Sequence, residues 1–135
     1  MKNVHLYGMV LTATLSMACI DNRSKPQDSL YQASDINEFE TLIADTDNVV
    51  LLDVRTQSEY DEGHLQNTLL IDINTDTFMV AARHYLPKEK TIAVYCRSGR
   101  RSAAAAEMLS ADGYKAVNME GGFIAWQKAG KPIEK

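Results

Sequence analysis

Residues 91–109 read TIAVYCRSGRRSAAAAEML, and this stretch decides the fold class. Its first part, Thr91 to Tyr95, is a short run of β-branched, apolar and aromatic residues, which is typical of a strand buried on both faces. Its last part, from Ala103 onward, is an alanine-rich segment of very high helix propensity. Cys96 and a short loop with one glycine connect the two. Strands that lead into helices in this way are the repeating units of an α/β domain.

The segments on both sides alternate in the same way. We expect strands near 30–33, 48–54, 68–73 and 115–119, and helices near 36–43, 57–62, 75–85 and 123–126. This alternation predicts an α/β fold with a central, mainly parallel sheet flanked by helices. Such sheets place their functional sites at the carboxyl ends of strands, and Cys96 follows one such end.

The loop after Cys96 has the features of an anion-binding site. The next helix is expected to begin near Ser102, acting as its cap, and the first turn of a helix carries unpaired N–H groups and partial positive charge. Gly99 permits the sharp backbone turn that such a loop needs. With Ser98, the loop is therefore expected to bind a small anion. The loop also contains three cations within a stretch of five residues: Arg97, Arg100 and Arg101.

Cys96 is the candidate nucleophile. A cysteine at the base of such a loop is expected to have a lowered pKa, because the N–H groups and cations stabilise its thiolate. A stabilised thiolate is a nucleophile that needs no separate base. The alternative is that Cys96 is an inert buried residue and that the arginines form a solvated surface.

Composition excludes several other classes. The chain has 135 residues, which suits one domain, and a net charge of −4, which disfavours a nucleic-acid-binding surface. No run of 18 apolar residues predicts a membrane-spanning helix. The sequence has no Cys-x-x-Cys motif or histidine cluster, so no metal or cofactor is expected, and a monomer is the default.

Residues 1–18 have the pattern of a secretory signal. Lys2 precedes a short apolar stretch, and small residues at 16 and 18 come directly before Cys19. A cysteine at this point resembles the lipidation site of bacterial lipoproteins, which implies an exported protein held on a membrane of the cell envelope through acylated Cys19. Residues 19–29 are then the anchor and a flexible tether, and 30–135 the folded domain. The alternatives are a soluble periplasmic protein cleaved at the same bond, and a cytosolic protein with a frayed N-terminus.

Four motifs in order resemble those of rhodanese-like sulfurtransferases. They span about residues 30–130 and comprise, in chain order, Asp53-Val54-Arg55 with Glu59-Tyr60, Gly63-His64 and Asn67; Cys96 to Ser102; Gly113-Tyr114 with Val117-Asn118; and Glu120 to Trp126. One departure is Leu65-Gln66-Asn67-Thr68, where the family pattern has Ile-x-Gly-Ala; the missing glycine puts the local turn in doubt.

This resemblance implies a mechanism. The Cys96 thiolate would take the outer sulfur of thiosulfate or a similar anionic donor, hold it as a persulfide, and pass it to a thiophilic acceptor that the sequence does not identify. Arg97, Arg100 and Arg101 would orient the donor, with Arg101 also organising the loop. Asp53 and Arg55 would be structural supports, as would His64, which is not expected to be a base.

Two other functions stay open at this point. Phosphatases with a related loop place five residues between the cysteine and the arginine, whereas four separate Cys96 from Arg101, and the longer spacing falls on Ser102. A binding module that relays sulfur or only holds a partner is the second alternative. Replacement of Cys96 by serine distinguishes an enzyme from such a module.

Overall fold

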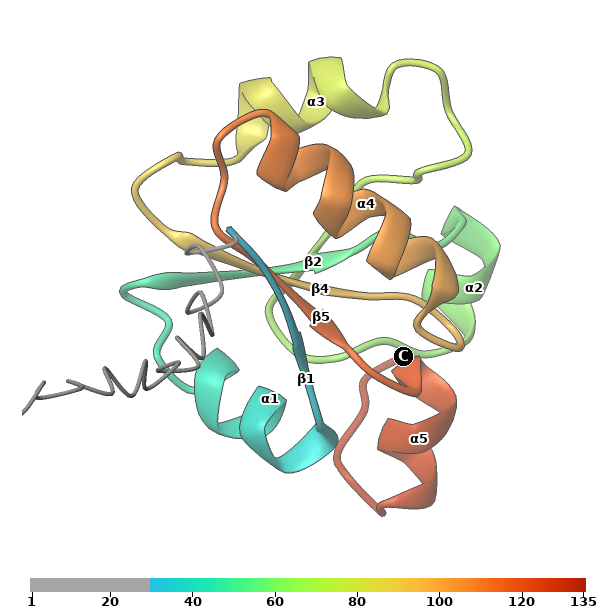
Figure 1. Cartoon of the computed structure of the whole chain (residues 1–135). Helices are drawn as coiled ribbons and strands as arrows, with labels where there is room; N and C mark the ends of the chain where they lie inside the picture. The colour runs from blue at the N-terminus through green and yellow to red at the C-terminus, as the bar shows by residue number, and fades with distance from the viewer. Residues whose placement is uncertain (1–29) are drawn as a thin grey trace, which may run out of the picture.

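The computed structural model describes residues 30–135, which form one sheet with helices on both sides (Figure 1). The strands are β1 (Tyr31–Ser34), β2 (Val49–Asp53), β3 (Thr68–Leu70), β4 (Thr91–Tyr95) and β5 (Ala116–Met119). The helices are α1 (Ile36–Ile43), α2 (Gln57–Glu62), α3 (Phe78–Tyr85), α4 (Arg100–Ala111) and α5 (Gly122–Lys128). The expected signal peptide (1–18), lipidation site (Cys19) and tether (19–29) lie outside the described residues.

The sheet has the order β1-β5-β4-β2-β3, and every strand pair in it is parallel. This confirms the predicted α/β class. Strand β4 lies at the centre, between β2 and β5. The carboxyl end of β4 is therefore enclosed by the ends of two neighbouring strands, which is where a parallel sheet places its site.

Two apolar cores cover the two faces of the sheet. Alternate residues of β4 point to opposite faces, so Ile92 and Val94 join one core while Ala93 and Tyr95 join the other. The first core packs against α3 and α4, and the second packs against α1 and α5 (Figure 1). Burial on both faces explains why β4 is a continuous apolar run.

The strand predicted over 68–73 is shorter in the structure. Strand β3 has only three residues, and all three are half-buried. It lies at the edge of the sheet and pairs only with β2, so one flank has no neighbouring strand to cover it. Beyond Leu70 the chain no longer forms a regular strand, but it still donates to the chain of β2 and its end, from Ile71 N to Asp53 O at 3.0 Å and from Ile73 N to Val54 O at 3.1 Å.

Local signals set the helix starts. Asp35 caps α1, and its carboxylate accepts from the N–H groups of Asn37 and Glu38, each at 2.9 Å. Thr56 caps α2 through a reciprocal arrangement with Glu59.

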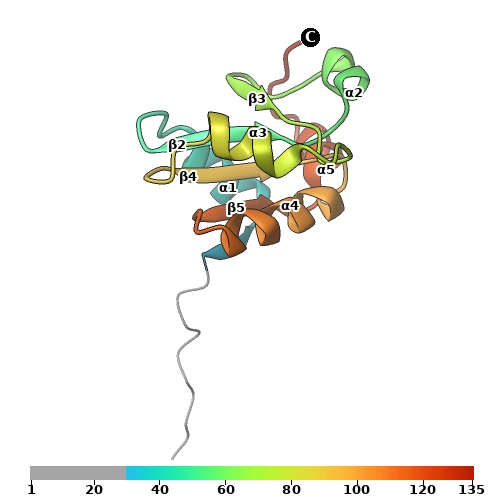
Figure 2. The ribbon, with the colours of Figure 1, turned by 90° about the horizontal axis from the view of Figure 1, so that it is seen from above.

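The last residues fold back across the molecule. His64 and Glu134 form an isolated antiparallel bridge, with His64 N to Glu134 O at 2.9 Å and Glu134 N to His64 O at 2.8 Å. The C-terminal end therefore lies near α2 and β3 (Figure 2). Within residues 30–135, no helix has the length and apolar character needed to span a membrane.

Candidate active site

Cys96 is the first residue after β4, and the loop that follows turns directly into α4. The residue has no exposed surface. Its Sγ accepts the N–H of Gly99 at 3.1 Å and the hydroxyl of Ser102 at 3.3 Å. Gly99 caps α4 with a φ of 95°, a left-handed conformation that suits the sharp turn expected of this residue. The loop thus directs donors at the sulfur from two positions along the chain.

Ser102 was expected to cap α4, and that expectation was wrong. The helix begins at Arg100, so Ser102 lies within its first turn and is fully buried. From there its hydroxyl reaches the sulfur instead of a backbone N–H group. Ser102 therefore supports the site by donating a hydrogen bond to the Cys96 sulfur rather than by capping the helix.

The hydrogen bonds determine the ionisation of Cys96. Burial by itself raises the pKa of the thiol, but the Ser102 hydroxyl and the N–H groups of Ser102, Gly99 and Ser98 outweigh it. The net result is a pKa below the ordinary value of 9.0. The lowered pKa of a cysteine in such a site is the property expected of a nucleophile.

Helix α5 supports the loop through two backbone hydrogen bonds. The N–H of Phe123 donates to the Cys96 carbonyl at 2.8 Å, and the N–H of Ile124 donates to the Arg97 carbonyl at 3.0 Å. Gly122 allows this contact, because a Cβ at that position would lie 2.5 Å from the Arg97 oxygen. Because the carbonyls of Cys96 and Arg97 are bound to α5, the N–H groups of the loop can face the sulfur.

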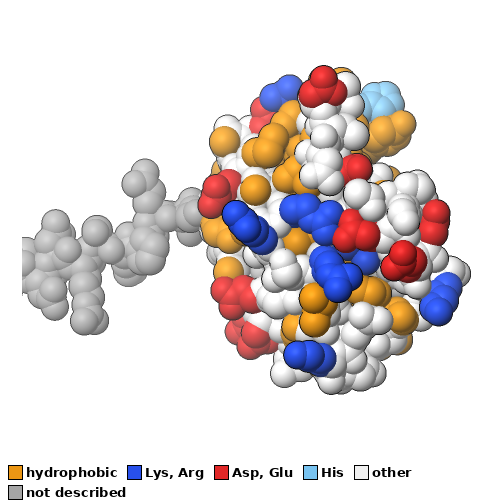
Figure 3. Space-filling model, turned by 90° about the vertical axis from the view of Figure 1, so that its right-hand side faces the viewer, with side chains coloured by type: hydrophobic (Ala, Val, Ile, Leu, Met, Phe, Trp, Pro, Cys, Tyr) orange, Lys and Arg blue, Asp and Glu red, His pale blue; other side chains and the backbone are white. Residues whose placement is uncertain are grey.

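The three arginines of the loop have different surroundings. Arg97 and Arg100 are exposed, as is Ser98. Arg101 is partly buried and donates to Glu59 of α2 through both terminal nitrogens, at 2.8 and 2.7 Å. Figure 3 shows the face formed by α2, α5 and the start of α4, where basic side chains gather around an acidic group.

Asp53 and Arg55 form a buried ion pair at the end of β2. Arg55 Nη2 lies 2.7 Å from Asp53 Oδ2 and also donates to the Gly63 carbonyl at 2.7 Å. The guanidinium lies 4.4 Å from the centre of the Phe123 ring, at the start of α5. The pair links β2 to the turn after α2 and to α5, and it makes no hydrogen bond to Cys96.

His64 stacks on Tyr60 with ring centroids 3.7 Å apart, and its Nδ1 lies 2.9 Å from the Tyr60 carbonyl. These contacts hold the turn between α2 and β3.

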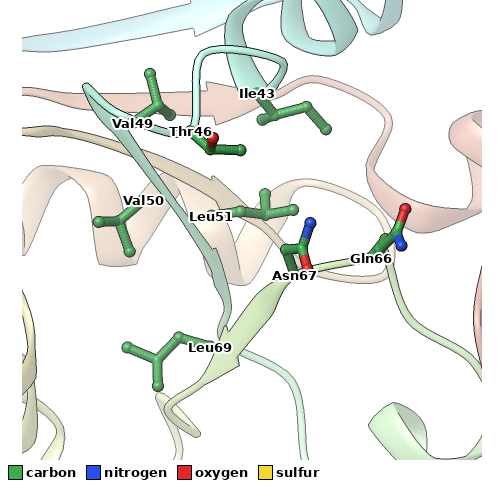
Figure 4. A pocket seen from close by; sticks show the side chains of 8 residues that line it. All are labelled: Ile43, Thr46, Val49, Val50, Leu51, Gln66, Asn67 and Leu69. Atoms are coloured by element: carbon green, nitrogen blue, oxygen red, sulfur yellow. The ribbon is translucent and has the colours of Figure 1, made fainter.

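A separate surface cavity of about 360 Å³ lies at the other ends of the strands. It contains none of the loop residues and is formed by Ile43, Thr46, Val49, Val50, Leu51, Gln66, Asn67 and Leu69 (Figure 4). Between Leu30 and Lys135, no cluster of three or more His, Cys, Asp or Glu side chains is arranged to hold a metal ion.

Comparison with known families identifies the domain. The family model of the rhodanese-like domain matches the sequence over residues 35–129, which include every strand after β1 and the whole Cys96 loop. This chain belongs to the rhodanese-like domain family.

Relatives of this rhodanese-like chain include proteins named as sulfurtransferases. It is 36% identical over 92 residues to a sulfurtransferase from Allochromatium vinosum, an alignment that covers 67% of this chain and 83% of the relative. It is 34% identical over 111 residues to thiosulfate sulfurtransferase 18 from Arabidopsis thaliana, covering 73% and 80%. The crystal structure of a rhodanese-like domain protein from Staphylococcus aureus has a TM-score of 0.64 at 32% identity, covering 77% of this chain and 99% of that one.

Two contributors to the site of this rhodanese-like domain were not assigned a role from the sequence. Glu59 and the start of α5 belonged to motifs, but nothing in their spacing predicted contact with the loop. The only local signal for Glu59 is its capping arrangement with Thr56, which explains α2 and not Arg101. Gly122 was visible only as one of two adjacent glycines.

Proposed function

We propose that this protein is a sulfurtransferase that carries sulfane sulfur as a persulfide on Cys96. The observation that carries the proposal is the sulfur of Cys96 held by Gly99 N–H and the Ser102 hydroxyl, in a domain whose relatives include sulfurtransferases. The proposed donor is thiosulfate or a similar small anion. The acceptor is a small molecule or protein thiol with affinity for sulfur.

The first step forms the persulfide. The Cys96 thiolate attacks the outer sulfur of thiosulfate, the sulfur–sulfur bond of the donor breaks, and sulfite leaves with the bonding electron pair. The negative charge then lies on the outer sulfur of the persulfide. The same N–H groups and hydroxyl that lower the pKa of the thiol are suited to stabilising that charge.

The second step returns the enzyme to its starting state. A nucleophilic acceptor attacks the outer sulfur of the persulfide, and the Cys96 thiolate leaves. With cyanide as the acceptor the product is thiocyanate. Four residues separate Cys96 from Arg101, one fewer than in the related phosphatases, and this shorter loop supports sulfur transfer over phosphate-ester hydrolysis.

The test is thiosulfate:cyanide sulfurtransferase activity of the protein against a Cys96→Ser variant. We expect thiocyanate from the unmodified protein only, together with a mass gain of one sulfur atom on Cys96 after incubation with thiosulfate alone. If neither thiocyanate nor the added sulfur is found while the fold is intact, the protein is a partner-binding module instead.

We also propose that residues 1–18 are a signal peptide and that acylated Cys19 holds the domain on a membrane of the cell envelope. The support is the sequence pattern alone: a basic start, an apolar stretch and small residues before Cys19. Labelled palmitate is expected to enter the protein and not a Cys19→Ser variant. A protein that stays unlabelled but is cleaved and released would be a soluble exported form.

A further inference from the structure

Arg101 and Glu59 form a two-pronged ion pair beside the Cys96 loop. Both terminal nitrogens of Arg101 donate to the carboxylate, at 2.8 Å to Oε2 and 2.7 Å to Oε1. Oε2 also accepts from the backbone N–H and the hydroxyl of Thr56, at 3.0 and 3.1 Å. The side chains are only 29% and 24% exposed. The guanidinium is therefore held on the side of α2 by a carboxylate that is itself fixed at the start of that helix.

The other two arginines of the loop are in a different position. Arg97 and Arg100 are exposed, and within residues 30–135 neither has an acidic ion-pair partner. An anion approaching Cys96 meets two unpaired cations and one cation whose charge is balanced by Glu59. A paired charge attracts an incoming anion much less than a free one, because the fields of the two partners nearly cancel.

We propose that Glu59 is a positioning residue that determines which arginines attract the donor. By holding Arg101, it leaves Arg97 and Arg100 to recognise the negative charge and keeps Arg101 as an anchor between α2 and α4. This inference rests on the proposed function for the identity of the donor, but its geometry concerns any anion that reaches Cys96.

The test compares two alkylating reagents that differ in charge. Iodoacetate is an anion and iodoacetamide is neutral, and both alkylate thiolates. The ratio of their rates therefore reports the attraction of an anion to the site, while changes in thiolate pKa or loop stability affect both rates alike. The assay needs no sulfur transfer, so it is independent of the proposed function.

Three kinds of variant give distinct expectations. We expect Arg97→Gln and Arg100→Gln each to lower the iodoacetate to iodoacetamide ratio roughly threefold, which is the size of effect that one nearby charge has on an anion in a water-like medium. Glu59→Gln raises the ratio by a similar factor, because Arg101 is no longer balanced. The double variant Glu59→Gln with Arg101→Gln returns the ratio to within about twofold of the unmodified protein, since a neutral pair replaces a neutral pair.

Other results would overturn the inference. It fails if the double variant lowers the ratio as far as Arg97→Gln does, because Arg101 would then attract the anion despite Glu59. It also fails if Glu59→Gln slows both reagents equally, which is the result of a purely structural role. Glutamine still suits the capping position, and circular dichroism checks that the variant is folded. Glu59→Asp, which keeps the charge, is the conservative control and should leave the ratio unchanged.

Sulfur transfer separates the two proposals. If the ratios follow the expected pattern but no thiocyanate forms, the proposed function fails and the inference stands. If thiocyanate forms but the ratios do not follow the pattern, the reverse holds. In an active protein, the KM for thiosulfate should rise in Arg97→Gln and Arg100→Gln and fall in Glu59→Gln.

Discussion

At the scale of single residues, the Ser102 hydroxyl is the side-chain group that distinguishes Cys96 from an ordinary buried thiol. Burial opposes ionisation of the thiol, and among the groups that lower its pKa this hydroxyl has the strongest effect. Ser102→Ala removes one hydrogen-bond donor from the thiolate, so the pKa of Cys96 should rise. We expect alkylation by iodoacetamide at pH 7 to slow roughly tenfold, with its pH profile moved upward.

Ser110→Ala is the matched control for this prediction. Ser110 lies in the same helix, and its buried hydroxyl has no partner among the described residues. Its removal should leave the pH profile of alkylation unchanged. An unchanged profile in Ser102→Ala would show that the backbone N–H groups alone set the ionisation of Cys96.

Asn67 occupies the position where the family pattern has glycine. Its φ of 58° is left-handed, a conformation that asparagine tolerates better than most residues, so the local turn survives the replacement. Asn67→Gly should change the free energy of unfolding by less than about 0.5 kcal/mol. Asn67→Val should lower it by roughly 1–2 kcal/mol, because a β-branched residue is strained there. Urea unfolding measures both, and equal stability of the two variants would contradict this explanation.

At the scale of elements, helix α5 acts on the site through backbone contact. A methyl group at Gly122 would lie 2.5 Å from the Arg97 carbonyl oxygen, so Gly122→Ala must push α5 and the loop apart. We expect sulfur transfer to fall at least tenfold and the free energy of unfolding to fall by roughly 2–4 kcal/mol.

Gly130 provides the comparison. It is also left-handed, with a φ of 70°, but nothing lies within 4 Å of a Cβ built there. Gly130→Ala should therefore lower the free energy of unfolding by only about 1 kcal/mol, the cost of a left-handed backbone conformation for alanine, and sulfur transfer should be unchanged. Equal losses in the two variants would mean that contact with the loop is unimportant.

The contact between α2 and α4 predicts a pH dependence. Arg101 is the main reason that the pKa of Glu59 falls from 4.5 to about 2. A lowered carboxyl pKa stabilises the fold above the unfolded pKa, and this contribution is lost as the pH falls through the folded pKa. The difference in unfolding free energy between the unmodified protein and Glu59→Gln should be roughly 1–2 kcal/mol at pH 7, after allowing for partial exposure. Urea unfolding should show it shrinking from pH 4.5 toward pH 2, and a constant difference would contradict the ion pair.

At the scale of the whole molecule, the C-terminal residues close the structure over the turn after α2. Removal of residues 133–135 deletes both backbone hydrogen bonds of the His64–Glu134 bridge and the half-buried Ile133. We expect the melting temperature to fall by several degrees, corresponding to roughly 1–3 kcal/mol. Removal of Lys135 alone should have no effect, and a truncated protein of full stability would show that the bridge contributes little.

The class of fold and the reactive loop were predictable because their signals are local. Apolar runs, caps and the alanine-rich helix each lie within a few neighbouring residues, as does the path from Cys96 through Gly99. The strand order is different, because β1 pairs with β5 across most of the chain. The same holds for the site. Glu59 contacts Arg101, and α5 contacts the loop, only once the sheet has formed, so no pattern in the sequence predicts these contacts.

The contact between α5 and the loop also orders events in time. Ribosomes make Cys96 before they make Phe123 and Ile124, whose N–H groups hold the carbonyls of Cys96 and Arg97. A nascent chain that ends between these points has the cysteine without its support. We expect its thiol to keep ordinary reactivity until the final helix has been made and has docked against the loop.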